Sequence, residues 1–242
     1  GAAAKLQYGE FSLEPGSSYD EIIAALSEYA KAESVRLTFP EGITAIDIAQ
    51  RMEAAGLCTA KEFLEEANTG DFSAYKFWQY VPNNKEAPDR FMKCEGYLFP
   101  DTYQFYMGDD PENVIDKFLR NFDNKFTDDL YDALDALNDR LAQRMRTNGF
   151  TETEITDGRL SLYDLITVAS LVEKETAKTS ESASIASVIY NRLCSKLYPC
   201  LEIDATIQYA LAERKEVLSN ADKGVISPYN TYTNAGLPAG PI

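Results

Sequence analysis

The sequence contains no histidine, and this absence excludes several kinds of active site. Without histidine the chain cannot build the Ser-His or Cys-His pairs that activate a nucleophile, or a histidine-based zinc site. It also shows no glycine-rich phosphate-binding loop and no internal repeat. We therefore expect no metal and no other cofactor, and we expect chemistry that depends on carboxylate, tyrosine and amide side chains.

Basic residues are scarce: 23 Lys and Arg stand against 39 Asp and Glu, for a formal net charge of −16. Such an acidic chain repels phosphate groups, which argues against nucleic acid or an anionic membrane surface as a partner. No apolar run reaches membrane-spanning length, and there is no signal peptide. The chain begins at Gly1 rather than at methionine, so a targeting or anchoring segment could precede it in the full protein.

Cysteine is also rare, with four residues whose spacing fits no zinc ribbon: Cys58, Cys94, Cys194 and Cys200. A chain of 242 residues with 45% hydrophobic content can bury a large core and does not need disulfide bonds for stability. Cys194 and Cys200 could pair across the short loop between them, or both could be free thiols. The sequence leaves both alternatives open.

The hydrophobic pattern predicts an α+β fold. Residues 35–39 alternate as a strand does, Thr44 can cap a helix, and Thr59 begins a capping box that opens another helix. Strand, helix and helix in close succession predict a small α+β module. Residues 1–34 are predicted to form a separate segment with a short strand before Pro15 and a helix from Tyr19 onward.

The second half is predicted to be mainly helical. An aromatic segment of irregular periodicity at 95–105 precedes it, and an irregular, polar and aromatic tail occupies 227–242. Helices are expected over 111–126, 130–147, 160–176 and 182–197, and from Asp204 onward, where the aspartate can cap the helix.

The helix expected over 160–176 carries a carboxylate inside its apolar face. At about 100° per residue, Glu173 falls between Leu162 and Ile166, whereas Glu175 lies at the edge, where it can reach water and keep an ordinary pKa. A carboxylate in apolar surroundings has a raised pKa, which suits a general acid near neutral pH. The alternative is a structural glutamate hydrogen-bonded to a buried backbone group.

Aromatic and amide side chains in irregular segments are typical of carbohydrate-binding grooves, where polar groups stand over an apolar floor. The alternative is that these side chains only pack the loops. The candidates are Tyr97, Phe99, Tyr103, Tyr229, Asn230, Thr231 and Tyr232.

Five motifs in this order carry a family resemblance. They read E-G-Y-L-F-P-D-T-Y at 95–103, V-A-S-L-V-E-K-E at 168–175, I-A-S-V-I-Y-N-R-L at 185–193, L-x-x-D-A-T-I-Q-Y at 201–209 and S-P-Y-N-T-Y-x-x-x-G-L-P-A-G-P-I at 227–242. Together they resemble the YceG-like endolytic murein transglycosylases over roughly residues 35–242.

The resemblance implies a LysM-like α+β module at 35–90, followed by a mainly helical catalytic domain with an irregular aromatic groove at 91–242. Relatives continue beyond the position of Ile242, so part of the family domain is expected to lie outside this chain. The resemblance also implies a single N-terminal membrane helix, outside this chain, that holds the catalytic body on the extracytoplasmic side of the cell membrane. The expected partners are peptidoglycan glycan strands and cell-wall synthases.

The resemblance further implies that Glu173 is the catalytic acid. It would cleave the bond between N-acetylmuramic acid and N-acetylglucosamine, form 1,6-anhydro ends and so terminate glycan strand elongation. The family usually has Gln and Pro at the positions of Glu202 and Ala205, so we expect no substrate contact from Glu202. We assign substrate binding to Tyr97, Asp204, Thr206, Tyr229, Asn230 and Thr231.

Two other functions remain open from the sequence. The first is a two-carboxylate peptidoglycan hydrolase, in which Glu173 would be partnered by Asp204, Glu175 or Glu95. The second is a non-catalytic wall-binding protein in which the LysM-like module does the binding.

Overall fold

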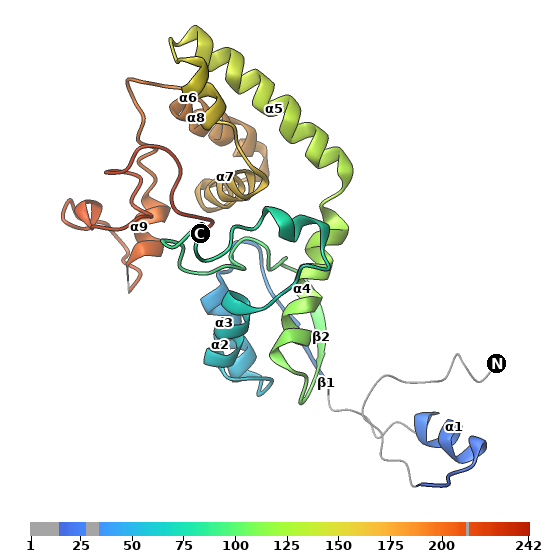
Figure 1. The fold of residues 1–242 in the computed structure, drawn as a ribbon. Helices are drawn as coiled ribbons and strands as arrows, with labels where there is room; N and C mark the ends of the chain where they lie inside the picture. Colours follow the sequence, from blue (N-terminus) through green and yellow to red (C-terminus); the bar gives the residue numbers. More distant parts are fainter. Residues whose placement is uncertain (1–14, 28–33, 212) are drawn as a thin grey trace.

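The computed structural model describes residues 15–27, 34–211 and 213–242, which form helices and one two-stranded sheet (Figure 1). The short strand predicted before Pro15 lies outside the described residues. The elements are α1 (Tyr19–Ser27), β1 (Ser34–Thr38), α2 (Ala45–Ala54), α3 (Ala60–Thr69), β2 (Thr102–Tyr106), α4 (Pro111–Lys125), α5 (Asp128–Thr147), α6 (Glu152–Asp157), α7 (Leu162–Glu175), α8 (Ser182–Leu193) and α9 (Asp204–Ala210), with 3₁₀ turns at Lys76–Tyr80, Thr179–Glu181 and Asp222–Gly224.

The sheet joins two segments that lie far apart in the sequence. β1 pairs with β2 in antiparallel register, with Val35 opposite Phe105 and Leu37 opposite Tyr103. The strand predicted at 35–39 is confirmed. The prediction that 95–105 is irregular is wrong at its end, because β2 is a short strand that forms by long-range pairing with β1 and shows little periodicity of its own.

The two helices after β1 begin where their capping residues predict. The hydroxyl oxygen of Thr44 accepts a hydrogen bond from the backbone N–H of Asp47, and Thr59 forms a full capping box with Glu62. Their apolar faces, with Ile48 on α2 and Phe63 on α3, are buried against each other and against α4.

One hydrophobic core runs from Phe39 to Tyr163 and includes the buried faces of α2, α3 and α4. Phe77 and Trp78, in the 3₁₀ turn between α3 and β2, are part of it. The core and the sheet therefore continue across residue 90. The division into a module at 35–90 and a domain at 91–242 stays a prediction.

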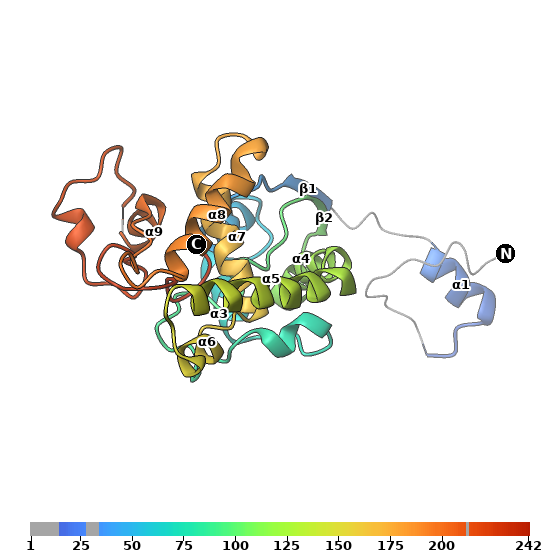
Figure 2. The ribbon, with the colours of Figure 1, turned by 90° about the horizontal axis from the view of Figure 1, so that it is seen from above.

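The C-terminal half packs around α7. A second core joins α7, α8 and the C-terminal segment through side chains such as Leu171, Ile189 and Tyr229. Seen from above, α9 and the loops that follow it lie on one side of α7 and α8, and the sheet lies on the other (Figure 2). This arrangement places α7 between the α2–α3–sheet part and the C-terminal loops (Figures 1 and 2).

Three details of this half differ from the predictions. The α6 helix was not expected, and α8 ends at Leu193 rather than 197, because the Ser195 hydroxyl accepts the N–H groups of the next residues in a turn. The expected cap at Asp204 is also wrong: Ile203 occupies the N-cap position, and the Asp204 carboxylate binds Tyr232 and Lys223.

All four cysteines are free, so the alternative of a Cys194–Cys200 disulfide is wrong.

Among the described residues, no helix has both the length and the apolar character that a bilayer crossing requires. The same part of the chain contains no group of three or more His, Cys, Asp or Glu side chains arranged to hold a metal ion.

Candidate active-site groove

A cavity of about 340 Å³ lies where α7 meets the loop that follows β1 and the segment 95–100. Phe122 of α4, Ile166 of α7 and Leu98 give it an apolar lining. Three carboxylates also line it, those of Glu41, Glu95 and Glu173. A cavity with an apolar wall and a few polar groups is typical of a ligand-binding site, and we call it the groove.

Glu173 stands in the last turn of α7 and is exposed. The prediction that it is buried is therefore wrong. The stripe it shares with Ile166 and Ala169 lines the groove, which is open to solvent, instead of entering the core. The buried residues of α7 are Leu162, Tyr163, Thr167, Val168 and Leu171.

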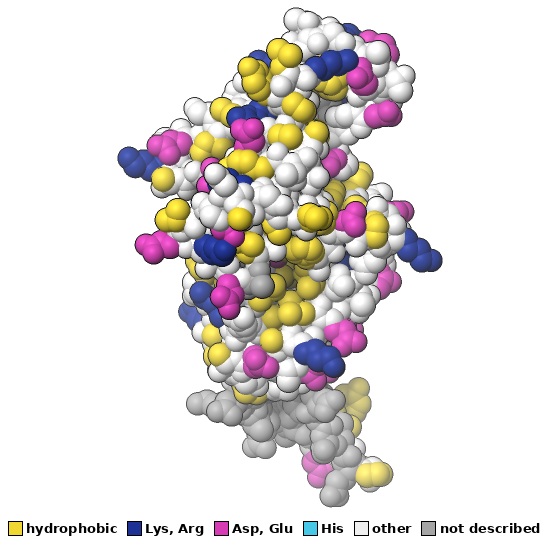
Figure 3. Space-filling view, turned by 90° about the vertical axis from the view of Figure 1, so that its left-hand side faces the viewer, with side chains coloured by type: hydrophobic (Ala, Val, Ile, Leu, Met, Phe, Trp, Pro, Cys, Tyr) yellow, Lys and Arg dark blue, Asp and Glu magenta, His cyan; other side chains and the backbone are white. Residues whose placement is uncertain are grey.

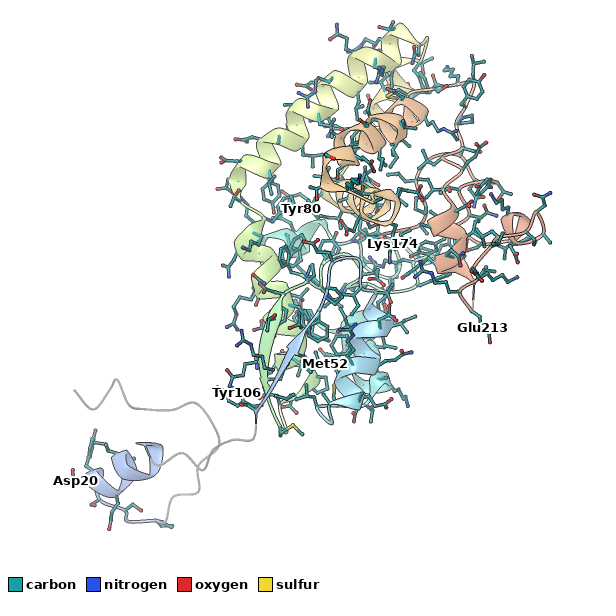
Figure 4. All side chains as sticks on the ribbon, turned by 180° about the vertical axis from the view of Figure 1, so that it is seen from behind. Asp20, Met52, Tyr80, Tyr106, Lys174 and Glu213 are labelled. Atoms are coloured by element: carbon teal, nitrogen blue, oxygen red, sulfur yellow. The ribbon has the colours of Figure 1, made fainter. Side chains whose placement is uncertain are left out.

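The loop between β1 and α2 lies against the Glu173 side chain. A Cβ atom on Gly42 would lie 3.8 Å from Cγ and 3.9 Å from Oε1 of Glu173. Lys174 fixes this loop, because its Nζ donates to the Gly42 carbonyl oxygen at 2.7 Å. Figure 4 shows Lys174 where α7 approaches α2. Two consecutive residues of α7 therefore lie beside one loop, and Lys174 is hydrogen-bonded to it.

Glu95 is the buried carboxylate of the groove, with 4% of its surface exposed. Both of its oxygens accept the Ala45 N–H at 3.1 Å, and Oε2 also accepts the Tyr209 hydroxyl at 3.0 Å. Burial raises the pKa of Glu95 to about 7, although these hydrogen bonds and the charge of Lys174 act in the opposite direction. From the sequence, Glu95 was predicted only as one of three possible partner carboxylates of Glu173. Its position as a charged residue beside an aromatic segment was a signal that it could be buried.

Gly96 allows the segment that carries Glu95 to approach α7 closely. Its φ is +84°, and a Cβ there would lie 2.7 Å from Cγ2 of Ile166 and 2.7 Å from Cβ of Pro241. The C-terminal segment is tied to the same helix, because the N–H of Ile242 donates to Oγ of Ser170 at 3.0 Å. Only glycine fits this packing without displacing its neighbours.

The predicted substrate-binding residues Tyr229 and Asn230 are fully buried. The Tyr229 ring packs on Phe91 and Tyr209 at centroid distances of 4.4 and 5.0 Å, and its hydroxyl accepts the Phe91 N–H at 3.2 Å. Nδ2 of Asn230 donates to the Val225 carbonyl oxygen at 2.7 Å. These contacts hold the C-terminal loops together.

Thr206 and Thr231 form a buried pair, with their hydroxyl oxygens 2.9 Å apart. Thr231 Oγ1 accepts the Ile203 N–H at 3.0 Å, and Thr206 donates to the Ile203 carbonyl oxygen at 2.7 Å. The pair fixes the start of α9, which carries Tyr209 and so reaches Glu95. The assignment of these residues to substrate binding stays a prediction.

Tyr97 and Asp204, the other two predicted substrate-binding residues, do not line the groove. Tyr97 is buried and stacks on Phe77 with ring centroids 5.4 Å apart. Asp204 is exposed and binds Tyr232 and Lys223; these hydrogen bonds lower the pKa of Asp204.

Of the three carboxylates predicted as partners of Glu173, Glu95 lines the groove and Asp204 and Glu175 do not. Burial, together with the nearby charge of Asp204, raises the pKa of Glu175. The expectation of an ordinary pKa for Glu175 is therefore wrong, because its carboxyl group is partly buried and also faces Asp204 at the start of α9.

The molecular surface in Figure 3 shows hydrophobic side chains gathered about the middle of one face, with acidic and basic side chains mainly around them. The face is hollowed near its centre. A surface of this kind can present apolar area to the C–H faces of sugar rings while polar groups at the margin bind their hydroxyls.

Comparison with known proteins gives matches over nearly the full chain. The model of the family described as YceG-like matches residues 1–242. The chain is 30% identical over 246 residues to the endolytic murein transglycosylase of Bacillus subtilis, covering 99% of this chain and 61% of that protein. It is also 30% identical over 256 residues to the endolytic murein transglycosylase of Streptococcus pneumoniae, covering 98% of this chain and 42% of that protein.

A solved structure agrees with these sequence matches. The fold is similar to that of a YceG-like protein from Listeria monocytogenes, with a TM-score of 0.66 and 30% identity over 98% of this chain and 72% of that chain. The chain spans less than two thirds of the length of the two transglycosylases that it matches.

Proposed function

The chain belongs to the YceG-like family, and we propose that it acts as an endolytic transglycosylase on the glycan strands of peptidoglycan. One observation carries the proposal: Glu173, the first glutamate of the V-E-K-E motif, lies exposed in a groove with an apolar lining. A carboxyl group in such a position can reach a glycosidic oxygen of a bound sugar chain. The names of the relatives support the same substrate class.

In the first step, the protonated carboxyl group of Glu173 donates its proton to the glycosidic oxygen between N-acetylmuramic acid and N-acetylglucosamine. The C–O bond breaks, and the N-acetylglucosamine end leaves as an alcohol. The positive charge that develops at C1 of the muramoyl residue is shared with its ring oxygen and stabilised by the substrate's own acetamido group.

In the second step, Glu173 is ionised and accepts the proton of the muramoyl 6-hydroxyl. The 6-oxygen attacks C1 and closes a 1,6-anhydro ring, so water is not the nucleophile. One carboxyl group serves first as acid and then as base, and the proton count balances over the two steps. A strand with such an end has no free reducing end, and we propose that the enzyme terminates strand elongation in this way.

A peptidoglycan hydrolase is the second candidate function, because Glu95 lines the same groove as Glu173. A hydrolase with two carboxylates needs the second one to face the sugar or a water molecule. The oxygens of Glu95 already accept hydrogen bonds from Ala45 and Tyr209, and the side chain is almost fully buried. These contacts favour the transglycosylase, in which one carboxyl group is sufficient.

Further parts of the proposal concern the whole protein. We place the catalytic body on the extracytoplasmic side of the cell membrane, anchored through an N-terminal helix outside this chain. Cell-wall synthases are the proposed protein partners, since termination has to act on strands as they grow. The strand and helices of 35–90 are the proposed LysM-like module, whose sheet is completed by β2.

Mass spectrometry of digested glycan strands tests the proposed function. The protein should cleave the strands at internal bonds, and each cleavage should create a new 1,6-anhydromuramoyl end. Reducing ends in their place would favour the hydrolase. Binding to insoluble peptidoglycan without any cleavage would favour the non-catalytic wall-binding protein.

A further inference from the structure

Glu95 lines the groove and connects three segments of the chain that meet beside it. The residue itself lies in the 95–100 segment, its oxygens accept the N–H of Ala45 at the start of α2, and Oε2 accepts the hydroxyl of Tyr209 from α9. α2 belongs to the N-terminal core and Tyr209 to the C-terminal one. A single buried carboxylate therefore holds together the two parts of the molecule between which the groove lies.

The loop that Glu95 holds is the one that lies beside Glu173 in the groove. Glu95 fixes the loop at Ala45, and Lys174 fixes it at the Gly42 carbonyl oxygen. At the Lys174 contact, the Gly42 backbone lies beside the Glu173 side chain. Glu95 and Lys174 therefore each hold this loop, at two different points close to Glu173.

We propose that Glu95 is a positioning residue of the lytic reaction: its ionised carboxylate holds the 42–45 loop and Tyr209 so that the groove presents a bound glycan to Glu173. The inference rests on the proposed function and adds a second residue to it. Glu95 acts through Ala45 and Tyr209 and does not transfer a proton to the substrate.

The hydrogen-bond partners of Glu95 favour its ionised form, although burial opposes that form. Both contacts come from donors, the N–H of Ala45 and the hydroxyl of Tyr209, and Lys174 is the nearby cation. A proton on Glu95 would replace an acceptor by a donor and would weaken one of these contacts. The groove should therefore lose its catalytic arrangement when Glu95 is protonated.

Four titratable groups face Glu95 from the elements packed around it. They are Lys174 from α7, Tyr209 from α9, Tyr229 from the C-terminal segment and the adjacent Cys94. Burial raises the pKa of Cys94 to about 12 and raises the pKa values of both tyrosines, so none of the three ionises near pH 7. Burial lowers the pKa of Lys174, an effect that the charge of Glu95 opposes.

Three further charged groups act on Lys174, the cation beside Glu95. Arg214, Asp47 and Glu173 act on Lys174 at longer range, and their charges partly cancel. Since the pKa of Glu95 is about 7 in the folded protein, the rate of the lytic step should rise as pH increases through this value.

The experiment measures kcat and KM for the formation of 1,6-anhydro ends between pH 5 and 9. Wild type, Glu95→Gln, Tyr209→Phe and Glu112→Gln are compared; Glu112 is an exposed residue in the first turn of α4. We expect Glu95→Gln to lower kcat roughly 10- to 100-fold, because a displacement of about 1 Å costs on this order. KM should change little, and the acid limb near pH 7 should disappear.

Tyr209→Phe keeps the ring and removes one hydrogen bond to the ionised carboxylate, so it should move the acid limb to higher pH with a smaller loss of kcat. If Glu95→Gln does not fold, the shift of the acid limb in Tyr209→Phe tests the same inference. Glu112→Gln should match wild type at every pH.

Two results would overturn the inference. If wild type is active and Glu95→Gln keeps both its kcat and its acid limb, or loses only melting temperature, Glu95 is merely structural. If wild type forms no anhydro ends at any pH, the proposed function fails and the inference falls with it.

Discussion

Glu95 and Glu173 line one groove from different elements, and one is buried while the other is exposed. Glu95 accepts three hydrogen-bond contacts from its own chain, whereas Glu173 stands beside the Gly42 backbone with its carboxylate open to the groove. The exposed residue is therefore the one that a bound sugar can reach, and the buried one holds the walls around it.

The stability of the Glu95→Gln variant should depend on pH. The pKa of Glu95 is about 7 in the folded protein and is expected near 4.5 in the unfolded chain, so the folded state binds the proton more tightly. This contribution to wild-type stability is fully present below about pH 4.5 and is lost as pH rises through 7. Relative to wild type, Glu95→Gln should gain up to about 3 kcal/mol in the free energy of unfolding between pH 4.5 and pH 8.

Urea denaturation at several pH values measures this difference. Glu112→Gln, at an exposed position, is the matched control and should show a difference from wild type that does not change with pH. A Glu95→Gln difference that stays constant between pH 4.5 and pH 8 would mean that Glu95 does not titrate in this range.

The Glu175→Gln variant should keep most of its activity. Glu175 does not line the groove, and burial together with the Asp204 charge raises its pKa. A neutral amide removes the repulsion from Asp204, so the melting temperature at pH 8 should stay the same or increase. Product analysis checks the activity. A loss as large as that of Glu173→Gln, in a folded protein, would contradict the choice of Glu173 as the acid.

The cysteines should have no part in catalysis. Cys94 is fully buried and burial raises its pKa to about 12, so a thiol reagent at pH 8 should modify it only after unfolding. Cys94→Ala should lower stability by about 1–2 kcal/mol through the cavity it leaves, with kcat unchanged. Loss of kcat in stable Cys94→Ala or Cys58→Ser protein would show that a thiol participates.

Alanine substitutions at Gly96 and Gly108 distinguish the cost of a packing clash from the cost of backbone strain. Both have positive φ, at +84° and +85°, but a Cβ would clash only at Gly96, against Ile166 and Pro241. Gly108→Ala should cost about 1 kcal/mol of stability from strain alone. Gly96→Ala should cost about 1–3 kcal/mol more and lower activity, because the segment with Glu95 has to move. Equal effects of the two changes on activity would mean that this close packing does not shape the groove.

Local signals in the sequence predicted much of the fold. Capping residues such as Thr44 and Thr59 and the apolar periodicity of α4 and α5 act over a few residues, and the structure has these helices near the expected positions. The β2 strand was missed because its partner β1 lies far away in the sequence. The end of α8 was missed because a serine side chain, and not a helix breaker, stops it.

For the groove, the helical wheel identified Glu173 but not its environment. The wheel shows which residues share a face of α7, and it cannot show whether that face meets the core or a cavity. The burial of Glu95 depends on Ala45 and Tyr209, which lie far from it in the sequence, so no local pattern could predict it.

The most direct test of the account compares wild type with Glu173→Gln by mass spectrometry of digested glycan strands, beside a thermal melt of both proteins. The amide keeps the size of the side chain but cannot give or take the catalytic proton, and such help is typically worth about 10²–10⁴-fold. We predict 1,6-anhydromuramoyl ends from wild type, background levels from Glu173→Gln, and equal melting temperatures because Glu173 is exposed. Anhydro ends from folded Glu173→Gln, or only reducing ends from wild type, would contradict the account.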